Sequence, residues 1–269
     1  MKRALAYARL HVELFWEYFV QYLKVRVNYR GDFFVSLATS TAATIFAFAV
    51  PVVIFRKAIL PDWTFEEVVF LYGFSLIPFG LFNVLSMNLY EFGATQIMEG
   101  KFDRVLLRPV NSLFQVLFET FRIESFFEAF TGVGILVWMR WRMQYHWTAG
   151  DVTFLIFFSI CGAIIYISLF LILSTFSFWF EDRVGVHPPF WNLLAFGRYP
   201  LTIYSGSIQF FLSWIVPFGF ATFYPGAKLL AHGDVHQLAR WVPVVSAACA
   251  GLAMFVWSRG VRHYSSTGS

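Results

Sequence analysis

The stretch from Gly93 to Asn111, GATQIMEGKFDRVLLRPVN, separates two strongly apolar blocks and carries five charged residues within ten positions. Gly100 can end an incoming helix, because glycine adopts the left-handed cap conformation at little cost. Asp103 can cap the N-terminus of a new turn, and Pro109 pushes the residue before it out of the helical region. The pattern predicts a short, rigid, charged elbow between two helices. A solvated loop that merely joins them is the alternative.

The composition around this elbow is that of a membrane protein. Hydrophobic residues make up 58% of the 269 residues and charged residues 13%, and the mean hydropathy is +0.63. Soluble domains carry about 25% charged residues. The net charge of +4 arises from basic residues spread through the loops, which does not indicate a nucleic-acid partner. The composition predicts an all-α, polytopic membrane protein.

Six apolar segments are predicted to cross the membrane, since about 20 residues suffice for one helical span. They are residues 33–55, 68–90, 123–140, 152–180, 207–224 and 241–257. Residues 1–32 precede them as an amphipathic helix, which fits the head-group region of a bilayer, packing on protein, or both. Its narrow polar stripe consists of Arg9, Glu13, Glu17, Gln21, Lys24 and Asn28. The whole chain, residues 1–269, is therefore expected to form one transmembrane domain.

The distribution of basic residues predicts the orientation of these spans. Six spans place both termini on one side, together with the loop at residues 91–112 that contains the elbow. Of the 20 Lys and Arg residues, 14 fall on that side and 6 on the other. Cytoplasmic loops of membrane proteins carry an excess of Lys and Arg. We therefore expect both termini and the elbow to be cytoplasmic, in a cell (inner) membrane.

Two polar residues within the predicted spans are candidates for a substrate path or a gate. Glu128 would lie inside the membrane, where an acidic residue is costly and marks a candidate functional site. The alternative is a structural polar cluster with Arg122 and Glu124 near the interface. Asn83 lies on the second span, where such residues most often hydrogen-bond to neighbouring helices.

The sequence contains no visible catalytic or metal-binding machinery. The only Gly-Lys pair, Gly100-Lys101, lacks the spacing of a phosphate-binding loop, so ATP binding by this chain is not expected. His232 and His236 lack a third ligand and are interpreted as part of a polar loop. An enzyme acting on lipids would need polar residues to converge near one membrane face, and the only candidates are Glu119, Glu124 and His187. Cys161 and Cys249 lie in apolar runs and are interpreted as buried thiols.

The decapeptide Gly100–Pro109, GKFDRVLLRP, resembles the G-x-L/F-D-R-x-L-L-R-P signature of a branch of ABC-2 type permeases. These are the six-span membrane subunits of ATP-driven ABC exporters. Further resemblance lies in Phe196–Pro200 with Ile203-Tyr204, in Val216-Pro217 and Tyr224-Pro225, and in the closing Gly260–Gly268. The resemblance covers nearly the whole chain, and the decapeptide is its most specific part.

The resemblance implies that the elbow is a coupling helix that docks on a separate cytoplasmic ATPase subunit. The implied interface residues are Glu99, Gly100, Lys101, Phe102, Asp103, Arg104, Arg108 and Pro109. ATP and Mg would bind the partner, and two permease chains, identical or related, would form a path between them for a hydrophobic or amphipathic drug, lipid or natural product. The alternative is a membrane scaffold or assembly protein that binds a cytoplasmic partner through the same elbow without moving cargo.

Overall fold

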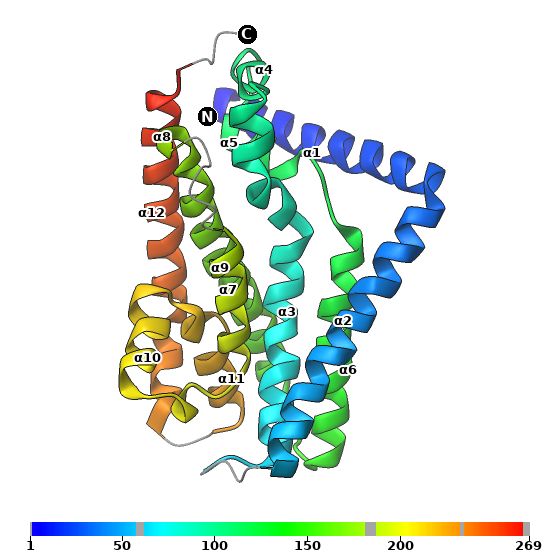
Figure 1. Ribbon diagram of the computed structural model, residues 1–269, viewed down its shortest axis with the longest axis vertical. Helices are drawn as coiled ribbons and strands as arrows, with labels where there is room; N and C mark the ends of the chain where they lie inside the picture. Colours follow the sequence, from blue (N-terminus) through cyan, green and yellow to red (C-terminus); the bar gives the residue numbers. More distant parts are fainter. Residues whose placement is uncertain (1, 58–61, 181–186, 232–233, 266–269) are drawn as a thin grey trace.

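The structure, a computed structural model, describes residues 2–57, 62–180, 187–231 and 234–265, and within these ranges it contains helices and no strand. The long helices run along the longest axis of the molecule, and α1 (Lys2–Asn28) lies across one end (Figure 1). This arrangement confirms the predicted all-helical class.

Four helical segments in the described ranges are long and apolar enough to cross a membrane. They belong to α2 (Arg30–Lys57), α3 (Phe65–Tyr90), α7 with α8 (Ala149–Thr175 and Ser177–Phe180), and η7 with α12 (Asp234–Trp241 and Val242–His263). The predicted third span corresponds to η2 (Ile123–Ser125) and α6 (Phe126–Arg142). Because α6 has only 17 residues, fewer than the usual 20 or so, the arrangement with six spans stays a prediction.

The predicted span at 207–224 is broken in the structure. Gly206–Ile215 (α10 and η5) and Gly219–Leu229 (η6 and α11) are bent by 81° relative to each other. The break occurs at Val216, whose φ of −119° and ψ of 86° are not helical, in keeping with the bias of a residue before proline away from the helical region. Pro217 also lacks the N–H that a continuous helix would use. Taken as one unit, this bent pair would be a fifth span.

Helix α3 is the centre of the molecule and packs closely against α6. A Cβ atom on Gly132 of α6 would lie 2.5 Å from the carbonyl oxygen of Gly73, and one on Gly80 of α3 would lie 2.7 Å from the backbone nitrogen of Ala129. Small residues at such crossings let two membrane helices approach closely. The contact fixes which faces of α3 and α6 meet, and therefore brings polar residues of the two helices together.

Helix α2 is much less enclosed than α3. None of the side chains of residues 30–50 is buried, whereas 89% of the apolar segment of α3 is. One contact between them is a hydrogen bond of 3.1 Å from the Tyr72 hydroxyl to the backbone oxygen of Thr44. The most exposed face of α2 carries Phe34, Val35, Ile45 and Phe46.

Helix α1 has three distinct faces. The six residues of the predicted polar stripe are exposed. A second face packs Phe15 and Phe19 edge-on against Phe121, with ring centroids 5.7 and 5.6 Å apart. A third face leaves Val12 and Trp16 more than half exposed. The helix therefore does pack on protein, and its open apolar face leaves room for the head-group position that was also predicted.

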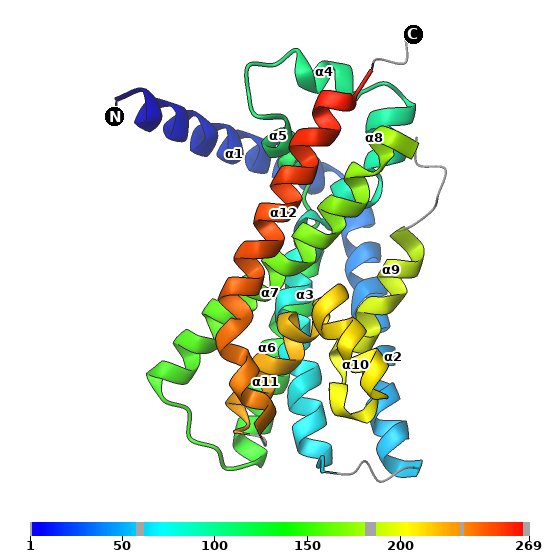
Figure 2. The ribbon, with the colours of Figure 1, turned by 90° about the vertical axis from the view of Figure 1, so that its left-hand side faces the viewer.

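The elbow, α1 and the C-terminal end of α12 lie at the same end of the molecule (Figures 1 and 2). The connection between α6 and α7 lies at the opposite end (Figure 2). This common end is consistent with the even number of crossings in the predicted topology. Which side of the membrane it faces stays a prediction.

Candidate functional site

The elbow continues α3 through a π-helical turn, η1 (Gly93–Met98), and a short helix, α4 (Phe102–Leu106). Gly100 ends η1 with a φ of 67°, and its N–H donates to the Ile97 oxygen at 3.1 Å, which confirms the predicted glycine stop. The predicted cap was wrong. Lys101 is the N-cap of α4 and Asp103 lies in its first turn, because the chain is already helical at Lys101. The helix ends before Pro109, where the N–H of Leu107 donates to the oxygen of Asp103.

Phe102 anchors this elbow to the rest of the molecule. Its side chain is fully buried, and its ring centroid lies 5.1 Å from that of Phe178 on α8 and 5.0 Å from that of Tyr264. Phe92 and Trp257 complete this aromatic cluster. Sequence reasoning placed Phe102 among the interface residues, but the structure places it beneath the surface, since an apolar residue in a polar stretch does not reveal its direction.

Tyr264 joins this cluster just beyond the end of α12. Its pKa is raised to about 12, first by burial and then by the nearby Asp103 carboxylate. The phenol is therefore neutral at physiological pH. The aromatic cluster thus ties α4 to both α8 and α12 without adding a charge.

The outward surface of the elbow combines exposed arginine with exposed leucine. Glu99, Arg104, Arg108 and Pro109 are exposed, and Lys101 pairs with Glu99 at 2.6 Å. Leu107 between the arginines is 83% exposed, and Leu106 is 45% exposed. Sequence reasoning missed both leucines as surface residues, although a leucine pair within a charged decapeptide was the available signal. Exposed apolar residues rimmed by charge mark sites of protein interaction.

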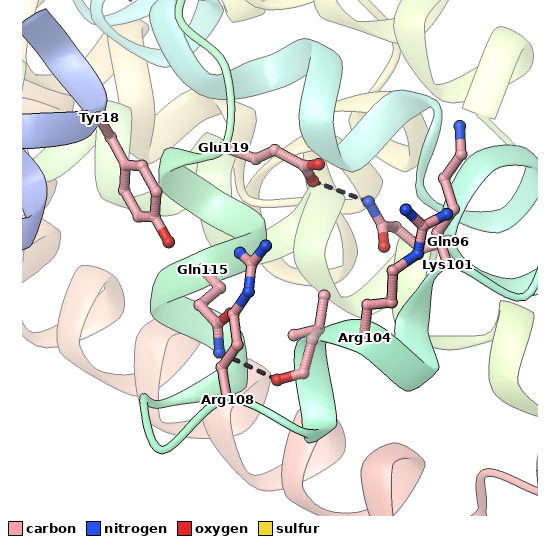
Figure 3. A pocket seen from close by; sticks show the side chains of 8 residues that line it. Tyr18, Gln96, Lys101, Arg104, Arg108, Gln115 and Glu119 are labelled. Carbon is pink, nitrogen blue, oxygen red and sulfur yellow. Dashed lines mark hydrogen bonds between the residues drawn. The ribbon is translucent and has the colours of Figure 1, made fainter. Parts of the chain in front are cut away.

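A cavity of about 100 Å³ lies between α4, η1, α5 (Ser112–Phe118) and α1 (Figure 3). Three cations and one carboxylate line it, namely Lys101, Arg104, Arg108 and Glu119. Gln96 donates to Glu119 at 2.7 Å, and Gln115 donates to the backbone oxygens of Val105 and Val110 at 3.1 and 3.0 Å. The Gln115 amide fastens α5 to α4, and the Gln96 amide fastens η1 to the residue after α5, so the elbow is braced from both sides.

A second polar cavity, of about 270 Å³, lies between α2, α3, α6 and the segment that includes η3 (Leu194–Arg198). It brings together Asn83 and Glu128, the two residues predicted for a substrate path or gate. The Asn83 amide donates to the Glu128 carboxylate at 2.8 Å. Arg122 and Arg198 also line this cavity, and the Arg198 guanidinium lies 4.5 Å from the centre of the Phe79 ring. The sequence had suggested Arg122 as a cluster partner of Glu128, but it gave no signal that Arg198 belongs to this site.

The predicted alternative, one polar cluster of Arg122, Glu124 and Glu128, is divided in the structure. Glu124 is fully buried and pairs with Arg26 of α1 at 2.8 Å. Arg26 also donates to the Tyr22 hydroxyl at 2.6 Å, and burial raises the pKa of that tyrosine. Glu124 therefore holds α1 against the start of α6, whereas Glu128 and Arg122 belong to the cavity.

The three acidic or imidazole residues considered for lipid chemistry have separate partners. Glu119 accepts from Gln96, Glu124 pairs with Arg26, and His187 lies 3.2 Å from the Ser174 hydroxyl. His232 lies outside the described residues, and within them no group of three or more His, Cys, Asp or Glu could hold a metal ion. Cys161 and Cys249 are free thiols; Cys161 is buried as predicted, whereas Cys249 is only partly buried.

Comparison with known proteins gives one family. The sequence model described as ABC-2 family transporter protein matches residues 39–268. No curated protein and no solved structure matches the chain.

Proposed function

The chain belongs to the ABC-2 family of transporter proteins, multi-pass membrane proteins that work with an ABC ATPase, and we propose that it is the permease subunit of an ATP-driven exporter. In such a system ATP and Mg bind the separate ATPase subunits. We further propose that the end carrying the elbow, with both termini, is cytoplasmic in a cell inner membrane. The cargo is a hydrophobic or amphipathic compound.

The observation that carries this proposal is the construction of the elbow. Its outer surface offers Leu107 between Arg104 and Arg108, while Phe102 holds the same short helix from within. A partner can bind the leucine by apolar contact and the arginines through carboxylates. Because α4 is anchored, a force applied to it is passed on to the helices beneath.

The contacts of the elbow define three routes for such a movement. The first is the covalent one, through η1 into α3. The second runs through the aromatic cluster from Phe102 to α8 and α12. The third runs from Val105 through Gln115 to α5, which packs against α1. Closure of two ATPase subunits would move these elements together, and two permease chains would switch between inward-facing and outward-facing packings.

The permease pairs with a second chain, identical or related, in this proposal. The side chains of Phe34 and Phe46 on one face of α2 are 63% and 76% exposed. This face supplies apolar surface for a neighbouring chain or for lipid. The scaffold alternative uses the same elbow, but it gives no role to the polar cavity between α2 and α3.

The test is a double variant, Arg104→Glu with Leu107→Asp, purified in mild detergent with the ATPase subunit that co-elutes with the wild type. Both residues are exposed, so folding should be unchanged, while ATPase recovery should fall about tenfold or more, as for loss of an interface hot spot. Arg142 is the last residue of α6, and this end of α6 lies opposite the elbow (Figure 1), so Arg142→Glu is the control and should retain the ATPase.

Undiminished co-elution of the ATPase with the double variant would refute docking at the elbow. If the wild-type complex hydrolyses ATP but moves no amphipathic cargo across reconstituted vesicles, the scaffold alternative replaces the transporter.

A further inference from the structure

The polar cavity between α2, α3 and α6 contains more positive than negative charge. Arg122 and Arg198 face one carboxylate, that of Glu128, which already accepts a hydrogen bond from Asn83. Within the described residues neither arginine lies within salt-bridge distance of a carboxylate. Arginine stays protonated in proteins, so one positive charge in the cavity has no counter-charge.

Such a charge is costly among helices that cross a membrane, and such residues mark pathways for ions or substrates. The guanidinium group is planar and donates two parallel hydrogen bonds, a geometry that matches phosphate and carboxylate oxygens. Ser40 of α2 also lines the cavity and brings a hydroxyl group to it, whereas the hydroxyl of Thr39 beside it already donates to the backbone oxygen of Val35 at 2.8 Å. The charge and the available donors therefore favour an oxyanion.

The remaining walls of the cavity are apolar, which suits an anionic group that is part of a larger amphipathic molecule. Leu76, Phe79 and Trp191 give the cavity an apolar part beside the arginines. Its volume of about 270 Å³ is below the range of roughly 300–1,000 Å³ typical of pockets that enclose a whole drug-sized ligand. The wall formed by α2 is the least packed, with no buried side chain in residues 30–50. A head group fits inside, and an apolar tail can leave past α2.

We propose that this cavity binds the anionic head group, a phosphate or a carboxylate, of an amphipathic molecule whose tail lies in the membrane. Arg122 and Arg198 bind the oxyanion, and Glu128, held by Asn83, limits the affinity so that the ligand can also leave. This inference rests on the proposed permease function for its link to cargo, but binding itself requires neither ATP nor the ATPase.

The test uses the full chain in nanodiscs of zwitterionic lipid. A fluorescent short-chain phosphatidic acid is titrated and its binding followed by anisotropy, with phosphatidylcholine of the same chain length as the reference probe. The wild type should prefer the phosphatidic acid. Arg122→Gln and Arg198→Gln should each weaken its binding by about tenfold or more, the effect of losing a charge-assisted hydrogen bond. Arg142→Gln, whose side chain pairs with Glu66 away from the cavity, should leave binding unchanged.

A gain of function separates this effect from misfolding. Glu128→Gln removes the negative charge while keeping the shape of the side chain, so it should tighten binding of phosphatidic acid several-fold. Weaker binding in that variant would overturn the proposal. So would a preserved preference for phosphatidic acid in the double arginine variant, which combines Arg122→Gln with Arg198→Gln. Inorganic phosphate that binds as tightly as the lipid would also overturn it, since the site would then recognise a free anion.

Two further measurements identify the source of the amphiphile. Phospholipid that co-purifies with the wild type and is lost from the double arginine variant identifies a bilayer lipid. Probe release on addition of ATP and the ATPase subunit identifies cargo. Both results support the proposed binding chemistry. A failure of binding in nanodiscs would leave docking of the ATPase at the elbow untouched, so the two proposals fail separately.

Discussion

The elbow and the membrane cavity are built from the same parts in different surroundings. In each, a side-chain amide donates to a carboxylate beside arginines, from Gln96 to Glu119 at 2.7 Å and from Asn83 to Glu128 at 2.8 Å. Glu119 is exposed, whereas Glu128 lies between helices that are predicted to cross a membrane. Water and salt screen charges at a surface, but a charge in the membrane must be balanced locally. The first arrangement therefore suits protein docking and the second suits selective binding of an anion.

The largest expected effect tests whether a buried charge in this protein depends on its local partner more than an exposed charge does. The buried carboxylate of Glu124 and its partner Arg26 provide this test. Arg26→Ala would leave a fully buried carboxylate without its partner, which costs about 3–5 kcal/mol in the free energy of unfolding. Adding Glu124→Gln should recover most of the loss, because an amide is easier to bury than a carboxylate. Unfolding by denaturant in detergent, followed by tryptophan fluorescence, measures both variants.

Helix α1 also supplies the matched control for this prediction. Arg9 pairs with Glu13 at 2.7 Å on its exposed face, so Arg9→Ala should leave the stability unchanged. Equal losses from Arg9→Ala and Arg26→Ala would show that burial does not set the strength of charge pairing in this protein.

Sequence reasoning located the long helices because sustained apolar runs determine them locally. The predicted spans at residues 33–55 and 68–90 lie within α2 and α3. The predicted span at residues 241–257 starts one residue before α12 and otherwise lies within it. It did not predict the bend at Val216, since a proline within an apolar run is compatible with either a kinked or a broken helix. The cap at Lys101 was also missed, because more than one residue of a polar stretch can begin a short helix and the sequence does not say which one does.

The two sites differ in how much of them the sequence reveals. The charges of the elbow lie within ten positions, so their grouping is visible in one stretch. The cavity joins residues that are far apart in the chain, because the close approach of Gly73 to Gly132 and of Gly80 to Ala129 decides which faces of α3 and α6 meet. Asn83 and Glu128 could therefore be named singly, while their contact could not be predicted.

Variants that remove one side-chain amide from the cavity or from the elbow compare the two sites directly. Asn83 and Gln96 are almost equally buried, with exposed fractions of 3% and 6%. Asn83→Ala should lower the free energy of unfolding by about 1–3 kcal/mol, because the carboxylate of Glu128 loses a donor where water is scarce. Gln96→Ala should cost less, because Glu119 is exposed and can be hydrated.

The same unfolding measurement supplies a second comparison. Glu128→Gln should recover stability in the Asn83→Ala background, whereas Glu119→Gln should change little in the Gln96→Ala background. If both amide variants lose the same stability, the membrane cavity is as well hydrated as the elbow.

The smallest effect that separates the two regions is their response to salt. Raising the ionic strength from about 0.1 M to about 1 M shortens the Debye length from about 10 Å to about 3 Å. Association of the ATPase through Arg104 and Arg108 should weaken several-fold, because these side chains are exposed. Binding of phosphatidic acid in the cavity should change less than about twofold, because salt screens partly buried pairs much less. Leu107→Ala should lower ATPase affinity at every salt concentration without changing the slope. An equally steep salt dependence in the cavity would show that its arginines face bulk solvent, and the contrast between the two regions would then be lost.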